Sequence, residues 1–147
     1  MSLPEGAAIA QTPEASNSLL NIVDISAAYT VLQSDSGNVF MLSGGPYTIT
    51  LPVAADLVQG WYCKFVVKEN TPAGDIQITA GSAIIDLVMK DAGNGDISNS
   101  TAGTAKTLYC MHTECTKGDY INVFTDGTSY YMEALSAIDD AIDHTVQ

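Results

Sequence analysis

The sequence predicts an all-β protein: an antiparallel β-sandwich, jelly-roll-like, with an extended N-terminal arm and a short C-terminal helix. Three observations predict this class. From about Asp24 onward, short runs rich in Val, Ile, Thr, Tyr and Phe recur roughly every 8–12 residues, as in sandwiches. Clusters of Gly, Pro, Asn and Asp separate these runs. No long helical pattern interrupts them, which argues against a parallel α/β sheet.

The first element is the arm, residues 1–24. It is rich in Ala, Ser, Glu, Pro and Asn, and it shows neither the period of two nor the period of 3.6. A frayed terminus is the ordinary explanation of such a segment. Scattered apolar residues favour instead a segment that becomes ordered on a partner. These candidate contact residues of the arm are Leu3, Pro4, Ile9, Leu19 and Leu20.

The sandwich domain follows over residues 25–136. Its apolar and β-branched runs have the length and the flanking turn residues of strands. Nine strands are expected: Ala28–Gln33, Asn38–Leu42, Tyr47–Leu51, Trp61–Lys68, Asp75–Thr79, Ala83–Met89, Lys106–His112, Asp119–Thr125 and Ser129–Ala134.

The last two strands carry the clearest hairpin signal, because Asp126-Gly127 lies between two alternating runs. With these two residues as the turn, Val123 pairs with Tyr130 and Ile121 with Met132, and the four share one face. The other face carries Tyr120, Asn122, Phe124, Tyr131 and Glu133. This face mixes polar residues with three aromatic ones, so it is either a solvated surface or a contact with a neighbouring subunit. Tyr120, Phe124 and Tyr131 are therefore a second set of candidate contact residues.

The chain ends in an acidic tail, residues 137–147. Ser136 is a suitable N-cap residue, and Asp139 and Asp140 would lie in the first turn of a helix. Leu135, Ile138 and Ile142 form a rough apolar stripe. These signals predict a short helix.

Charge excludes several classes of function. The chain has 147 residues and a net charge of −12, with five lysines and no arginine. We expect neither nucleic-acid binding nor binding to anionic membranes, because both depend on cationic side chains. No apolar run reaches the roughly 18 residues of a transmembrane helix, and no signal peptide is expected. Three cysteines do not form a disulfide framework, so reduced thiols are expected.

One cluster has the residue types of a metal site: Cys110, His112 and Cys115. A closed zinc site needs four ligands, and only Cys63 or His144 remains to supply the fourth. For Cys63, packing as a small apolar residue is the simpler explanation. A Cys–His catalytic pair is disfavoured, because side chains two apart on a strand are about 7 Å apart. We therefore expect no catalytic residue, no metal and no cofactor.

Two stretches resemble small β-rich structural proteins of tailed bacteriophages. The first is YTITLPVAA at 47–55, continuing through GWY at 60–62 to KFVV at 64–67. The second is GDYINV at 118–123 followed by TDGTSYY at 125–131, which looks like the closing hairpin of those proteins. The resemblance covers about residues 45–135. It implies a virion component rather than an enzyme.

Among such components, a small β-domain with an extendable arm is most like a capsid decoration (cement) protein. The resemblance implies a homotrimer on the outer capsid surface that contacts the major capsid protein and stabilises the shell. An acidic surface is compatible with that position, since it would not bind packaged DNA. The arm is suited to adding a strand to a sheet edge on a capsid subunit or a neighbouring protomer. The alternatives are a trimeric tail-fibre or receptor-binding tip for a host glycan or surface protein, and an unrelated β-sandwich module or enzyme.

Overall fold

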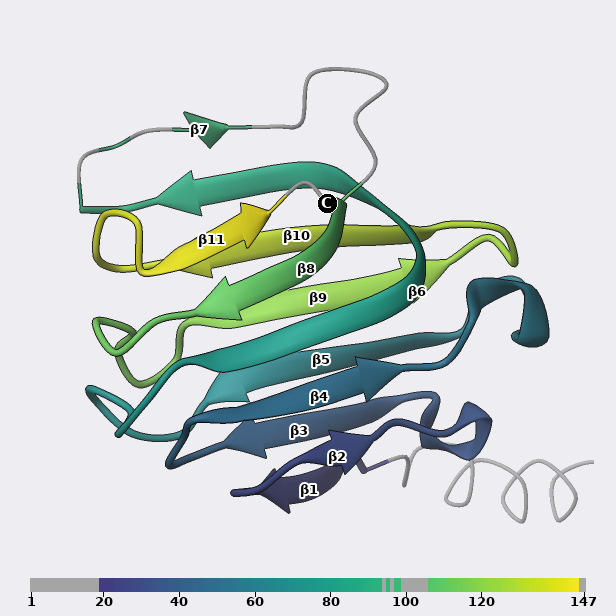
Figure 1. Cartoon of the computed structure of the whole chain (residues 1–147), viewed down its shortest axis with the longest axis horizontal. Coiled ribbons are helices and arrows are strands. Elements are labelled where there is room, and N and C mark those ends of the chain that lie inside the picture. The colour runs from purple at the N-terminus through teal and green to yellow at the C-terminus, as the bar shows by residue number, and fades with distance from the viewer. Residues whose placement is uncertain (1–18, 94, 96, 99–105, 146–147) are drawn as a thin grey trace, which may run out of the picture.

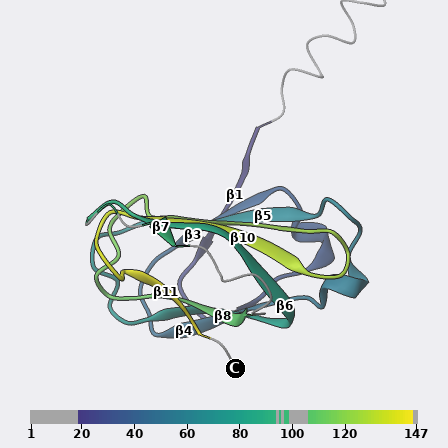
Figure 2. The same cartoon turned by 90° about the horizontal axis from the view of Figure 1, so that it is seen from above.

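The computed structural model describes residues 19–93, 95, 97–98 and 106–145. This part of the chain is mostly β-strand, contains no α-helix and forms two facing layers (Figures 1 and 2). One layer is a mixed sheet of five strands in the order β1-β3-β5-β9-β10, and the other is built on three parallel strands, β2-β4-β6. No described helix has the length and apolar character that crossing a membrane requires.

The N-terminal half winds as a coil, and each turn of the coil contributes one strand to each of the two sheets. The turns are β1 (Asn21–Ile25) with β2 (Tyr29–Thr30), β3 (Asn38–Leu42) with β4 (Tyr47–Leu51), and β5 (Tyr62–Val67) with β6 (Ile76–Asp91). Because successive strands of one sheet are a full turn apart, β1, β3 and β5 run parallel, as do β2, β4 and β6. Two short 3-10 turns, η1 (Gln33–Asp35) and η2 (Ala54–Asp56), lie at the corners of the coil.

Strand β6 joins the two layers. Its first part, Ile76–Ala80, pairs with β4, and its last part, Ile84–Asp91, pairs in parallel with β10 (Tyr130–Ser136) in the other sheet. The strand bends between these parts, as Figure 1 shows beside the β6 label. The bend falls on a run of small residues, Ala80 to Ala83, which leaves room for the change of direction.

The remaining strands complete both layers. β9 (Tyr120–Thr125) forms an antiparallel hairpin with β10, and it also pairs antiparallel with β5. β8 (Lys106–Met111) pairs antiparallel with β6, and β11 (Ile142–Thr145) pairs antiparallel with β8. β7 (Ile97–Ser98) pairs with the end of β6.

The core lies between the layers and contains large side chains from both. Phe40 and Phe65 stack with ring centroids 5.3 Å apart, on adjacent parallel strands. Trp61 meets Tyr130 edge-on at 6.2 Å and donates its indole N–H to the carbonyl of Gln33 at 2.9 Å. The Tyr130 hydroxyl donates to the carbonyl of Pro52 at 2.7 Å, so both polar tips in this contact are satisfied.

The predicted β-sandwich is confirmed as a mostly β protein of two sheets, but the purely antiparallel, jelly-roll-like arrangement is wrong. Alternation in a sequence shows which side chains share a face, and it does not show strand direction. The predicted strands Asn38–Leu42 and Tyr47–Leu51 have the observed bounds. The two predicted strands Asp75–Thr79 and Ala83–Met89 are one strand, because Gly81 and Ser82 form a bend and not a turn.

Neither end of the described chain has the structure that its sequence suggested. β1 begins at Asn21, within the segment assigned to the arm, and β11 lies within the segment assigned to the acidic tail. The predicted C-terminal helix is wrong, because residues Ile142–Thr145 form the strand β11. A short isolated helix is marginal in stability, whereas Ala141 and Ile142 are buried and β11 gains a ladder to β8. A turn containing Asp140 at φ 54° leads into β11 instead.

Candidate functional site

The outer face of the five-stranded sheet is the most unusual surface of the described chain. A sheet with one solvated face normally alternates apolar-in and polar-out. Here the outward positions form three rows across the strands, and apolar residues make up most of them. The rows are Tyr62–Phe124–Tyr131, Ile22–Val39–Lys64–Asn122–Glu133, and Asp24–Met41–Val66–Tyr120–Leu135. We call these residues the outer face.

Several apolar side chains of the outer face are open to solvent. Ile22 is 61% exposed, Tyr62 is 54% exposed and Phe124 is 41% exposed. Single exposed apolar residues are common on protein surfaces. Tyr62 and Phe124 are paired on the adjacent strands β5 and β9, and Ile22 lies on β1 of the same sheet, beyond the half-buried Val39 of β3. Apolar side chains gathered on one sheet in this way mark interaction sites.

Aromatic stacking orders the first row. The rings of Phe124 and Tyr131 are 5.1 Å apart and 10° from parallel. The Tyr131 hydroxyl donates to Asp126 Oδ2 at 2.9 Å, which raises the pKa of Tyr131. The N–H groups of Ser129 and Thr128 donate to Asp126 Oδ1, each at 2.8 Å. These bonds, with the Tyr131 hydroxyl, lower the pKa of Asp126, so a charged carboxylate caps the hairpin loop.

The polar side chains of the outer face are engaged with their neighbours on the same face. Lys64 Nζ lies 4.1 Å from the centroid of the Tyr120 ring, a cation–π contact. Asn122 donates from Nδ2 to Glu133 Oε1 at 2.6 Å. The middle of the face therefore offers a partner the aliphatic stems and ring faces of its residues.

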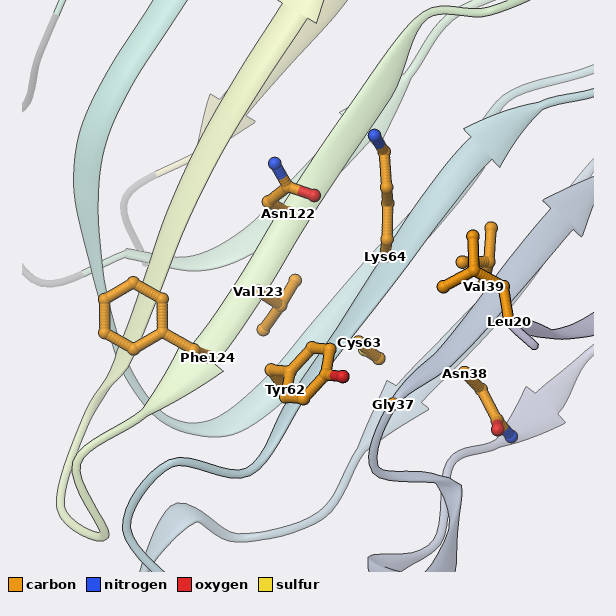
Figure 3. Close-up of a pocket in the computed structure, with 10 residues that line it drawn as sticks. All are labelled: Leu20, Gly37, Asn38, Val39, Tyr62, Cys63, Lys64, Asn122, Val123 and Phe124. Carbon is orange, nitrogen blue, oxygen red and sulfur yellow. The ribbon is translucent and has the colours of Figure 1, made fainter. Parts of the chain in front are cut away.

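A shallow groove of about 280 Å³ lies on this face, where β1, β3 and β5 begin and β9 ends. Figure 3 shows Val39 and Leu20 on one side of it, Phe124 on the other, and Tyr62 and Lys64 between them. Its described lining residues are Leu20, Gly37, Asn38, Val39, Tyr62, Cys63, Lys64, Asn122, Val123 and Phe124. The lining is mainly apolar, with a few amide groups at its edge.

A hydrogen-bond network fixes the corner beside the groove. Asp35 is buried and accepts hydrogen bonds from the Leu32 N–H at 2.8 Å, the Tyr29 hydroxyl at 3.1 Å and Asn38 Nδ2 at 3.0 Å. Asn38 in turn accepts a hydrogen bond from Asn21 Nδ2 at 2.7 Å. This chain of contacts ties the first residue of β1 to β3 and to the 3-10 turn η1.

The described side chains among the residues with metal-ligand types make other contacts. The Cys115 thiol is buried and donates to the carbonyl of Ala141 at 3.0 Å, while His112 Nδ1 lies 3.3 Å from Asp75 Oδ2. The side chain of Cys110 lies outside the described residues, as does that of His144. Cys63 is in the core, and burial raises the pKa of its thiol. Within the described part of the chain no three His, Cys, Asp or Glu side chains gather as a metal site.

The candidate contact residues of the hairpin lie where their pattern placed them. Tyr120, Phe124 and Tyr131 share the outer face with Asn122 and Glu133. The predicted register is wrong, because the loop has four residues instead of two. Tyr130 pairs with Thr125, Met132 with Val123, and Ala134 with Ile121. Thr125 Oγ1 accepts from the Gly127 N–H and donates to the Ser129 carbonyl, which stabilises this longer loop.

The structure describes two of the five candidate contact residues of the arm, Leu19 and Leu20. Leu19 is 91% exposed and Leu20 is 69% exposed, and Leu20 lines the groove. Leu3, Pro4 and Ile9 lie outside the described residues.

Sequence reasoning missed the other apolar residues of the outer face. These residues are Ile22, Val39, Met41, Tyr62, Val66 and Leu135. The run from Trp61 to Val67 contained a usable signal, because it is apolar or amphipathic at nearly every position. A strand that is apolar on both faces is covered on both faces.

Comparisons of the chain with protein-family models, with curated proteins and with solved structures give no match.

Proposed function

We propose that this protein is a virion structural protein of a tailed bacteriophage, a capsid decoration protein that binds the outer shell as a homotrimer and stabilises it. One observation carries the proposal: the outer face is a contiguous, largely apolar surface spread over five strands. Burial of such a surface against another protein is favourable in proportion to the apolar area removed from water. The work of the protein is then binding, and the residues that perform it are those of the outer face and of the segment before β1.

The charge of the chain supports the same proposal. A net charge of −12 makes copies repel one another and repel DNA. Association must therefore depend on apolar contact, which salt does not weaken. Salt screens the repulsion between acidic surfaces, so we expect the oligomer to be favoured as ionic strength rises.

The first test is the solution mass of the full chain, measured by light scattering over a range of dilutions and at two salt concentrations. A mass near three times 15.5 kDa at the lower protein concentrations is the expected result. A monomer at all concentrations contradicts the proposal. The second test adds the protein to capsids that lack it and measures their thermal release of DNA, which decoration is expected to shift to higher temperature.

The groove favours a second candidate function, a trimeric tail-fibre or receptor-binding tip. Exposed faces of Tyr62 and Phe124 lie near two polar side chains of the lining, Asn122 and Lys64. Aromatic faces beside a few hydrogen-bonding groups suit the apolar faces and hydroxyls of a sugar. Binding of a neutral oligosaccharide to the trimer, with loss of binding in Phe124→Ala and no effect of the protein on capsid stability, would favour this candidate.

A further inference from the structure

We infer that residues 1–18 of one copy of the chain occupy the groove of a neighbouring copy, with apolar side chains such as Ile9 packed on Val39, Tyr62 and Phe124. This inference rests on the proposed oligomer, and it names the segment that covers part of the outer face. It also assigns a specific partner to the apolar residues of the N-terminal segment.

The chemistry of the groove matches that segment. Among the described residues that line it, Lys64 alone is charged, in a chain with a net charge of −12. Residues 1–18 include Leu3 and Ile9, and their only charged side chains are Glu5 and Glu14. An apolar groove with one cation therefore meets an acidic segment with spaced apolar residues.

The same charges argue against covering the groove with the outer face of a second copy. On that face Asp24 is paired with Lys68 at 2.7 Å, but the whole second chain brings its net charge of −12 with it. Two such faces meeting directly would bring the acidic bodies close together. A narrow segment makes the apolar contact and keeps the bodies apart.

The segment is long enough to do this. Eighteen extended residues reach at most about 60 Å. The groove crosses from β3 to β9, a width of about 10 Å at the usual strand spacing. About four or five extended residues are enough to cross it, so most of the segment remains to bridge the gap between copies.

The start of β1 indicates that the receiving groove belongs to another copy. Leu19 and Leu20 are largely exposed, and Figure 2 shows the beginning of β1 standing away from the sandwich. Leu20 forms one edge of the groove of its own chain, but a segment that continues along the direction of β1 moves away from that groove, and a neighbour in a ring is able to receive it. In a closed ring each copy gives one segment and receives one, so every interface of the ring gains the same contact and the contacts together strengthen the oligomer.

Photocrosslinking of the full chain tests the inference. Ile9 is replaced by the photoreactive residue p-benzoylphenylalanine, the protein is irradiated, and the products are separated on a denaturing gel. Exchange between copies predicts a product of twice the chain mass, whose crosslinked peptides map to residues 37–41, 62–64 or 122–124. A crosslink within one chain leaves the mass of a single chain, so the gel distinguishes the two geometries.

Two variants show whether the groove itself is responsible. Val39→Asp places a carboxylate in the lining, and we expect the double-mass product to fall at least about tenfold, the change that a loss of about 1.4 kcal/mol produces. Thr50→Asp is the matched control, since Thr50 is an exposed strand residue on the outer side of the opposite sheet. It is expected to leave the product unchanged. Phe124→Ser replaces Val39→Asp if circular dichroism shows that the latter does not fold.

The outcomes separate this inference from the proposed function. A crosslink to the groove at the mass of one chain means that the segment folds back on its own sheet, and it overturns exchange. Crosslinks elsewhere, in a protein that light scattering shows to be trimeric, overturn the groove assignment and leave the proposed function standing. A monomer in light scattering overturns both.

Discussion

Replacing Asp35 by alanine removes the central acceptor of the corner that holds β1 to β3. The side chain is 9% exposed and accepts three hydrogen bonds, from the Leu32 N–H, the Tyr29 hydroxyl and the Asn38 amide. A buried donor that loses its acceptor costs about 1–3 kcal/mol. The Tyr29 hydroxyl is able to rotate towards water, so the N–H of Leu32 and the amide of Asn38 account for most of the loss. We expect Asp35→Ala to lower the free energy of unfolding by about 3 kcal/mol.

Urea unfolding at one fixed protein concentration measures this loss. With a slope of about 2 kcal/mol per molar urea, the midpoint is expected to fall by about 1.5 M. Asp56→Ala is the matched control, because Asp56 ends the other 3-10 turn and its side chain is exposed. Substitutions at such sites usually change stability by no more than about 0.5 kcal/mol. Equal midpoints for the two variants would refute the idea that the Asp35 network holds this corner.

Two further predictions concern the hairpin loop and the thiols. The loop N–H groups and the Tyr131 hydroxyl lower the pKa of Asp126 from its ordinary 3.8. The Asp126 carboxylate therefore stabilises the fold fully above pH 3.8, and it stabilises the fold progressively less as the pH falls towards the lowered pKa of the folded chain. The stability difference between wild type and Asp126→Asn, measured by urea unfolding, is expected to shrink below about pH 4, and a constant difference would contradict it. Cys63 and Cys115 are 2% and 0% exposed, and burial raises the pKa of Cys63. Iodoacetamide is expected to modify neither thiol in the folded chain and both in urea, by peptide mass spectrometry, because only an accessible thiolate reacts; labelling of either in the folded chain would show that it is not buried.

Local patterns predicted what local physics controls. Alternation along residues 120–125 and 130–134 placed Ile121, Val123, Tyr130 and Met132 on one face, and all four are buried. Strand bounds at 38–42 and 47–51 were correct, because turn residues flank them on both sides. The hairpin register was wrong by two residues, because the loop has four residues instead of two. Thr125 donates a hydrogen bond to the Ser129 carbonyl, and Asp126 accepts hydrogen bonds from the N–H groups of Thr128 and Ser129. These hydrogen bonds stabilise a four-residue loop in place of the two-residue turn.

The sequence predicted only the part of the outer face that lies on the closing hairpin. Tyr120, Phe124 and Tyr131 were found because β9 and β10 are adjacent in sequence. Val39 and Ile22 come from strands whose place beside them depends on the coil of parallel strands. No property of a single run indicates that residues so far apart in the chain form one row.

The sequence by itself determined that the protein is made of strands, which side chains of the closing hairpin share a face, and that its surface is acidic and free of arginine. These follow from residue type and from the period of two, which act over a few neighbouring residues. Tertiary structure alone decided which strands run parallel, the single bent strand β6 and the strand at Ile142–Thr145 in place of a helix. It also assembled the outer face from five strands. These features depend on which distant segments pack together, and the free energy of that packing outweighs local preference.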